Sequence, residues 1–141
     1  MTNLLSLVAS YLASKLTMTA GTNVFYNEMP DEPAKCVLVQ EIQNPGIAVH
    51  PQIDGEIHRI KVSVRDTTYE LANNLAQLCW RWLLTDKTEF TSDKRTDTTG
   101  FVTIADLATV QITLYGNPVW EKSDQQGRKY YSFYATILTK R

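Results

Sequence analysis

Few residues in this chain have both the side-chain chemistry and the sequence context of a catalytic site. The two histidines, His50 and His58, are the side chains whose ordinary pKa lies nearest neutrality. Neither stands in a spacing typical of a hydrolase triad, a zinc protease or a phosphate-binding glycine loop. His58 falls on the apolar face of a predicted strand and is expected to be half-buried, whereas His50 precedes Pro51 in a loop. We therefore predict no catalytic residue and no enzyme.

Two cysteines complete the set of candidate metal ligands. Cys36 and Cys79 are each flanked by apolar residues, which predicts buried thiols that pack as small hydrophobic groups. The most specific metal hypothesis is a zinc site formed by these cysteines with His50 and His58. Structural zinc ligands usually come in closely spaced pairs, and this sequence has no such pair. We expect no metal and no cofactor.

Acidic and basic residues are nearly balanced, with 14 Lys and Arg against 15 Asp and Glu, for a formal net charge of -1. A dedicated nucleic-acid binder usually has a basic excess that neutralises phosphates, so this class is disfavoured. Three basic residues, Arg59, Lys61 and Arg65, nevertheless share the outward face of one predicted strand. This strip is either a solvated surface, a contact with an acidic neighbouring subunit, or a contact with DNA phosphates. The sequence leaves these three interpretations open.

The composition predicts one folded domain over residues 1–141. Hydrophobic residues make up 43% of the chain and charged residues 21%, close to the averages of globular proteins. A chain of 141 residues is of ordinary single-domain size. The first residues lack a positive region, and serines interrupt their apolar run, so we predict neither a signal peptide nor a membrane span. We expect the chain to be cytosolic when it is made.

Helical periodicity appears in two segments. Residues 3–16 place leucine, valine and tyrosine at three- and four-residue spacing, and Gly21 is expected to stop this helix. A second helix is predicted from a capping box at Thr67 and Glu70 to about Leu84. Its predicted apolar face comprises Leu71, Ala72, Leu75, Ala76, Leu78, Cys79, Trp82 and Leu83. Trp80 and Trp82 point in different directions, so one of them is expected nearer the surface, as an interface anchor or packed under the N-terminal helix.

Strand patterns occupy most of the remaining chain. Residues 34–41 contain an unbroken apolar run typical of a strand buried on both faces. Residues 57–65 alternate, with Ile60, Val62 and Val64 on the apolar face, and residues 109–115 alternate with Val110, Ile112 and Leu114 inward. Residues 101–104 are a short candidate strand, and residues 130–139 are β-branched and aromatic. Residues 23–26 could add a short extended piece. Gly116-Asn117-Pro118 is expected to break one strand, and residues 123–127 to form a hairpin tip. We predict an α+β fold in which an N-terminal and a central helix pack on a mostly antiparallel sheet of four to five strands.

Features outside this predicted core suggest contact surfaces. Residues 43–56 and 85–100 read as long loops, and loops of this length are usually functional or mobile. The aromatic run at residues 130–134 places aromatic side chains on both faces of its strand. Such a strand suits a sheet that is covered on both sides, by helices of the same subunit or by a neighbouring subunit.

An ordered set of short segments, spread over most of the chain, resembles the minor capsid or tail-terminator family of long-tailed bacteriophages. The first group is Val24-Phe25-Tyr26, Met29-Pro30 and Cys36-Val37-Leu38-Val39. The second is Ile60-Lys61-Val62-Ser63-Val64-Arg65-Asp66, followed by Tyr69 and Leu71-Ala72. The third is Gly116-Asn117-Pro118, Asp124, Gly127-Arg128 and Tyr131-Ser132-Phe133. Each segment is short, and the specificity of the resemblance lies in their order.

The resemblance implies a structural subunit of a homo-oligomeric ring, usually a hexamer, at the head-proximal end of a phage tail tube. Such a ring stops tube polymerisation and presents a surface for the head. The implied partners are other copies of the chain, the tail tube protein, a head-completion or neck protein and the tape-measure protein. DNA is implied only as passing through the lumen, and no membrane is implied. The implied location is the tail or neck of the virion, after assembly in the host cytoplasm.

The residues expected at subunit or tube contacts come from the two long loops, the basic strip and the turn before the last strand. They are Gly46, His50, Gln52, Asp54, Arg59, Lys61, Arg65, Lys87, Lys94, Arg95, Asp124 and Arg128. Two other functions stay open. A neck or head-completion protein could share this order of elements, and a small enzyme or nucleic-acid-binding protein would need a polar pocket or salt-sensitive binding to DNA.

Overall fold

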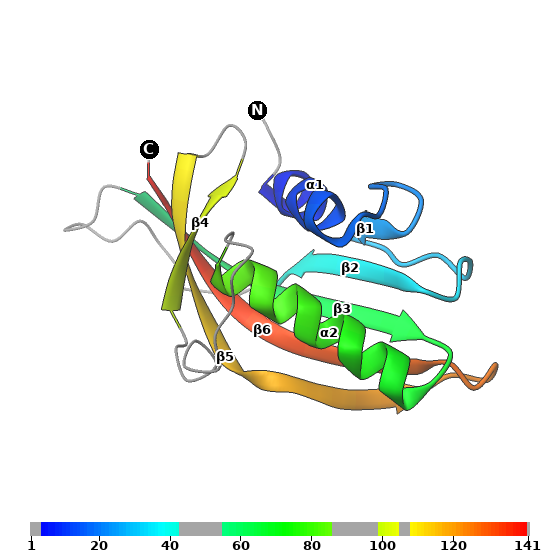
Figure 1. Cartoon of the computed structure of the whole chain (residues 1–141). Coiled ribbons are helices and arrows are strands. Elements are labelled where there is room, and N and C mark those ends of the chain that lie inside the picture. Colours follow the sequence, from blue (N-terminus) through cyan, green and yellow to red (C-terminus); the bar gives the residue numbers. More distant parts are fainter. Residues whose placement is uncertain (1–3, 43–54, 86–98, 105–107, 141) are drawn as a thin grey trace.

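The computed structural model describes residues 4–42, 55–85, 99–104 and 108–140. Within these described residues, two helices and six strands follow one another in sequence (Figure 1). They are α1 (Leu4–Leu16), β1 (Val24–Tyr26), β2 (Cys36–Glu41), β3 (Gly55–Asp66), α2 (Tyr69–Leu84), β4 (Thr99–Ile104), β5 (Ala108–Ser123) and β6 (Lys129–Lys140).

The strands form one mixed sheet in the order β1-β2-β3-β6-β5-β4. All neighbours are antiparallel except β1 and β2, which run parallel. The α+β class is as predicted, but the expected four to five strands are too few. The additional strand is β1, whose three residues pair with Val37, Leu38 and Val39 of β2. Three residues are too few to show an alternating pattern, so the sequence alone does not identify β1 as a strand, and its pairing with β2 does.

Both helices lie on the same side of the curled sheet (Figure 1). The core between them is built from the inward residues of the central strands, with Ile60, Ile112 and Phe133 all at most 1% exposed. The expected inward set of residues 57–65 and 109–115 is confirmed for Val62, Val64, Ile60, Val110, Ile112 and Leu114. Period-two alternation therefore located the core face of the sheet correctly.

The helix α1 ends at Leu16, as predicted, but Gly21 is not what ends it. Thr17 adopts a left-handed backbone conformation with φ +58°, and the Met18 amide donates to the Ala13 carbonyl at 2.8 Å. These features close the last turn of the helix. Gly21 belongs to the next turn, where its φ is +86°.

The helix α2 begins one residue later than the predicted capping box. Thr68 is the N-cap, with its hydroxyl accepting a hydrogen bond from the Leu71 amide at 3.1 Å. The Thr67 amide instead donates to the Asp66 carboxylate at 2.7 Å. Because Thr68 takes the extended conformation that capping requires, it displaces Thr67 from this role.

The buried face of α2 is also rotated relative to the prediction. Leu71 and Leu78, expected in the core, are 48% and 42% exposed, whereas Trp80 is 4% exposed. The residues facing the sheet are Ala72, Leu75, Ala76, Cys79, Trp80, Leu83 and Leu84. Trp82 is the tryptophan nearer the surface and packs beside α1, where the Tyr11 hydroxyl donates to its carbonyl at 2.5 Å. The alternative of packing against the N-terminal helix is the correct one.

The strand β5 continues through Gly116-Asn117-Pro118, which was expected to break it. The pairing with β6 shifts register between Tyr115 and Val119, so these residues form a bulge inside a longer strand. Gly116 has φ +72°, and its carbonyl accepts the indole N–H of Trp80 at 2.9 Å. The tip between β5 and β6 lies where the sequence predicted it. In the part of the chain that the structure describes, no helix has the length and apolar character needed to cross a membrane.

Candidate functional site

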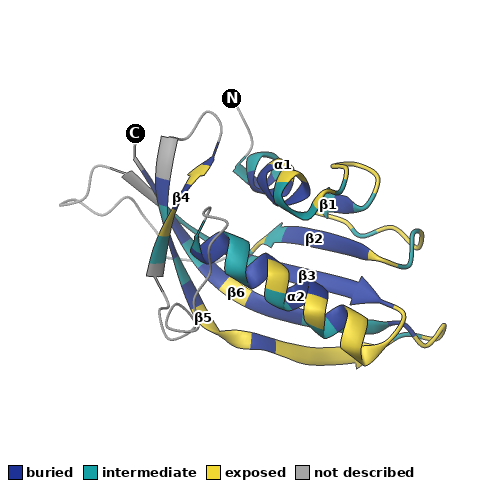
Figure 2. Ribbon diagram, in the orientation of Figure 1, coloured by how far each residue is buried: buried dark blue, intermediate teal, exposed yellow. Residues whose placement is uncertain are grey.

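The face of the sheet opposite the helices carries large exposed side chains, three of them aromatic and one aliphatic. Phe101, Tyr115, Val119 and Tyr134 are between 44% and 62% exposed. In Figure 2 the exposed residues of β5 lie in its second half, toward the hairpin with β6. Large apolar residues that are exposed together on one face mark interaction surfaces more often than scattered ones do.

Cross-strand register places two tyrosines and two cations next to one another on this face. Lys61 of β3 is the partner of Tyr134 of β6, which is in turn the partner of Tyr115 of β5. Arg59 lies two residues along β3, so it projects from the same face in the adjacent row. We call Arg59, Lys61, Tyr115 and Tyr134 the tyrosine–cation patch.

The side chains of the patch contact one another directly. The Arg59 guanidinium carbon is 5.7 Å from the centroid of the Tyr115 ring, and the Lys61 ammonium nitrogen is 5.9 Å from that of Tyr134. Both distances fall within cation–π range. The Lys61 ammonium also lies 2.6 Å from a carboxylate oxygen of Glu121. Arg59 has no ion pair among the described residues, so its charge is available to another molecule.

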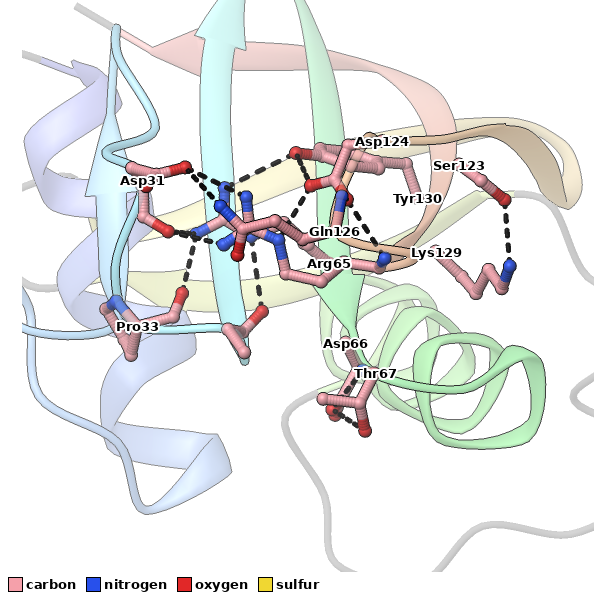
Figure 3. Close-up of polar contacts among 12 residues, drawn as sticks. Asp31, Pro33, Arg65, Asp66, Thr67, Ser123, Asp124, Gln126, Lys129 and Tyr130 are labelled. Carbon is pink, nitrogen blue, oxygen red and sulfur yellow. Dashed lines mark hydrogen bonds and ion pairs between the residues drawn. The ribbon is translucent and has the colours of Figure 1, made fainter.

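Arg65, expected to extend the exposed basic strip, is instead buried at 2% exposure. Its Nη2 donates to the carbonyls of Pro30, Asp31 and Pro33, and its Nε donates to that of Ala34 at 3.2 Å (Figure 3). The loop before β2 crosses this end of the sheet and covers the guanidinium. The strip therefore comprises only Arg59 and Lys61, and Arg65 holds a loop within its own subunit.

Arg128 fastens the same loop to the hairpin between β5 and β6. Its guanidinium is 3.0 Å from a carboxylate oxygen of Asp31 and 2.6 Å from one of Asp124, and it also donates to the Asp31 carbonyl. Arg128 is only 6% exposed. Burial favours the neutral guanidine, but the hydrogen bonds from the Arg128 side chain to Asp31 and Asp124 outweigh it and raise the pKa of Arg128. We call Arg65 and Arg128 with their partners the arginine clasp.

Asp124 organises the hairpin end of the clasp. One carboxylate oxygen accepts the amides of Gln126 and Arg128, at 2.9 and 3.0 Å, and the other accepts the Tyr130 hydroxyl at 3.1 Å. Desolvation acts to raise the pKa of Asp124, but the hydrogen bonds from the backbone and side chain of Arg128, from Tyr130 and from the Gln126 amide outweigh it. The pKa of Asp124 falls to about 2, so the carboxylate is ionised at neutral pH.

The clasp fixes the course of an acidic segment, residues 28–32, which we call the acidic loop. Glu28 and Glu32 are exposed, and neither has an ion pair among the described residues. Asp31 is 73% exposed at its side chain even though it pairs with Arg128. A clasp of buried arginines thus presents unpaired carboxylates at the surface.

The two thiols are buried and separated by the sheet. Cys36 pairs with Arg65 in the register of β2 and β3 and shares its face, whereas Cys79 lies on α2 at the opposite face. Burial raises the pKa of Cys79 to about 12 and also raises that of Cys36. The prediction of core thiols is confirmed, and this separation contradicts a zinc site that would use both. The described residues contain no cluster of three or more potential metal ligands.

His58 is half-buried, as expected, with Nδ1 3.3 Å from a carboxylate oxygen of Glu41 on the neighbouring strand. The other loop candidates, Gly46, His50, Gln52, Asp54, Lys87, Lys94 and Arg95, lie outside the described residues. The structure brings Arg59 and Lys61 together at the patch, and Arg65, Asp124 and Arg128 together at the clasp. The sequence analysis did not include Tyr115 in the candidate contact surface. The alternation of residues 109–115 does place its side chain on the outward face, and this was the signal that could have identified it.

Comparison with known proteins shows which family the chain belongs to. A family model described as bacteriophage tail terminator protein matches residues 11–141, from within α1 through all six strands. The chain belongs to this tail terminator family. It is therefore a structural protein of a phage-type virion, as the resemblance of its ordered segments indicated. Membership in a structural family favours a role without catalysis.

The tail terminator fold is also similar to that of a solved virion component. A chain in the structure titled "Virion of native gene transfer agent (GTA) particle" superimposes with a TM-score of 0.59. The alignment covers 98% of this chain and 95% of that chain at 14% sequence identity. Likeness at this identity establishes the shared fold. No curated protein matches the sequence significantly.

Proposed function

We propose that this tail terminator family member forms a closed homo-oligomeric ring, a hexamer, on the head-proximal end of a tail tube. The ring stops tube polymerisation and presents the surface that joins the head. The observation that carries the proposal is the match of the tail terminator model to residues 11–141. The proposed partners are the tail tube protein, a head-completion or neck protein and the tape-measure protein, with DNA passing only through the lumen.

The open side of the sheet supports a ring that closes by unlike contacts. One side of the sheet carries the helices, and the other carries the exposed tyrosine–cation patch. When such a patch binds a different surface of the next copy, the head-to-tail contacts close into a ring if the rotation allows. We place Arg59 and Lys61 at this subunit contact. We assign residues 43–56 and 85–100 to contacts with tube or neighbouring subunits.

The test is to image the purified protein by negative stain and to measure its mass, alone and mixed with the tail tube protein of the same phage. We expect rings of six copies that bind tube ends and arrest further tube growth. A protein that stays monomeric and binds neither tube nor head components would overturn the proposal. Binding to portal or head protein without binding to tube would favour the neck or head-completion function instead.

A further inference from the structure

We propose that the acidic loop of one subunit docks on the tyrosine–cation patch of the next copy in the ring. This inference rests on the proposed ring and names the residues that close it. The occupant of the patch is a second copy of this chain, and the contact pairs Glu28 and Glu32 with Arg59 and Lys61.

Met29 of the acidic loop lines the same pocket as Lys61 of the patch, but neither Glu28 nor Glu32 has an ion pair among the described residues. Glu32 lies between Asp31 and Pro33, whose carbonyls accept hydrogen bonds from Arg65. Arg59 is six residues from Arg65 along the same strand, which places the two ends about 20 Å apart at the rise of a β-strand. Attraction between charges at this separation is largely screened at physiological salt. A neighbouring copy, in contrast, can place its acidic loop directly on the patch.

The charges of the two surfaces are complementary. Glu28 and Glu32 are exposed and have no ion pair among the described residues, and the same holds for Arg59 at the patch. Lys61 already pairs with Glu121 but keeps about a fifth of its side chain exposed. Complementary patches of this kind steer association and fix register.

The patch also supplies the apolar part of an interface. Tyr115 and Tyr134 are 48% and 44% exposed, and Val119 beside them is 60% exposed. Tyrosine and arginine are enriched in interface cores because they combine a large apolar area with polar groups. At the loop, Met29 and Pro30 stand between the two glutamates and offer apolar surface to these rings.

The arginine clasp makes the acidic loop a suitable partner for docking. Four carbonyls of residues 30–34 are held by Arg65, and Asp31 is held by Arg128. A segment that is ordered before association loses less conformational entropy when it binds. The loop is therefore presented in one conformation to the next subunit.

Charge reversal tests the pairing. We would prepare a patch variant, Arg59→Glu with Lys61→Glu, a loop variant, Glu28→Lys with Glu32→Lys, and a third protein with all four changes. The mass of each would be measured by sedimentation over a range of protein concentration, alone and with tube protein, and rings on tube ends counted by negative stain. We expect each reversal alone to raise the concentration for half-assembly by about tenfold or more, because like charges then face each other. The variant with all four substitutions should recover at least part of the lost assembly.

Mixing supplies an independent check. In an equimolar mixture of the patch and loop variants, each contact in an alternating ring again joins opposite charges, so rings should form at a lower protein concentration than with either variant alone. Glu70→Lys serves as the control, because it reverses an exposed glutamate on the helical side and should leave assembly unchanged. All substitutions are at exposed or half-buried positions, and circular dichroism should show folded proteins.

The outcomes separate this inference from the ring itself. If the wild-type protein forms rings and both reversed variants assemble as it does, the acidic loop and the patch are not the contact, while the ring proposal stands. Loss of rings that neither the variant with all four substitutions nor the mixture restores would also overturn the pairing. A wild-type protein that forms no ring in solution or on tube ends would overturn both proposals.

Discussion

The Arg65 side chain is the contact whose removal tests most directly how the acidic loop is held. It is 2% exposed and donates to four main-chain carbonyls through two nitrogen atoms. Arg65→Met keeps most of the aliphatic length and removes the charged donors. The variant therefore separates the hydrogen bonds of the guanidinium from the packing of its stem.

The expected cost follows from these contacts. A hydrogen bond to a charged group contributes about 1.5–3 kcal/mol net. Three of the four carbonyls share Nη2, so the bonds are not independent, and the carbonyls of the exposed Pro30 and Asp31 can be rehydrated. Taking the low value for each of the two donor nitrogens, we expect Arg65→Met to lower the free energy of unfolding by about 3 kcal/mol.

Urea denaturation followed by circular dichroism measures this change, with proteolysis of the loop as a second readout. The matched control is Arg59→Met, the same substitution on the same strand and face, which removes only a cation–π contact with Tyr115 and should cost about 0.5–1 kcal/mol. We expect Arg65→Met, and not the control, to accelerate cleavage within residues 28–34. A loss below about 1 kcal/mol with unchanged cleavage would refute the reasoning, because the loop would then hold its position without the guanidinium.

Three further predictions concern the cap, the core and the hairpin. Thr68→Ala should destabilise the protein by about 1 kcal/mol in urea denaturation through loss of the cap of α2, whereas Thr67→Ala should cost less; equal costs would contradict the assignment of the cap. Phe133→Ala, at a side chain 1% exposed, should cost about 3–5 kcal/mol in the same assay, and a cost under about 2 kcal/mol would mean that the core collapses around the cavity. The pKa of Asp124 is lowered from 3.8 to about 2, so its ionised form stabilises the fold above pH 3.8 and this contribution is lost as the pH falls toward 2. Melting temperatures of the wild type and Asp124→Asn should therefore differ at neutral pH and converge near pH 2, and a constant difference would show that ionisation is not what stabilises the hairpin.

Sequence patterns located the elements whose signal is local. The alternation of residues 57–65 fixed the inward face of β3, and the periodicity of α1 and α2 gave helices that end at Leu16 and Leu84 as expected. The turn residues at 123–127 placed the hairpin correctly. In each case the residues that define the element are neighbours in the chain, so their spacing carries the information.

The predictions that failed depend on partners far away in sequence. Gly116 was expected to end a strand, but pairing with β6 continues past it through a bulge, and the indole of Trp80 bonds its carbonyl. Arg65 was expected to be exposed, but a loop more than 30 residues earlier covers it. No local pattern at either residue reports these contacts. The sequence predicted Arg59 and Lys61 on one outward face, but their packing against Tyr115 and Tyr134 depends on the register of three strands.

The position of β6 determines whether the tyrosine–cation patch is complete. This strand follows every other described element in sequence, yet it lies between β3 and β5 at the centre of the sheet. Without β6, both β3 and β5 would present an unpaired edge. The patch joins Arg59 and Lys61 on β3, Tyr134 on β6 and Tyr115 on β5, so it does not exist until β6 is inserted. In the proposed ring, a chain that lacks β6 would therefore have no complete patch to receive the acidic loop of another copy.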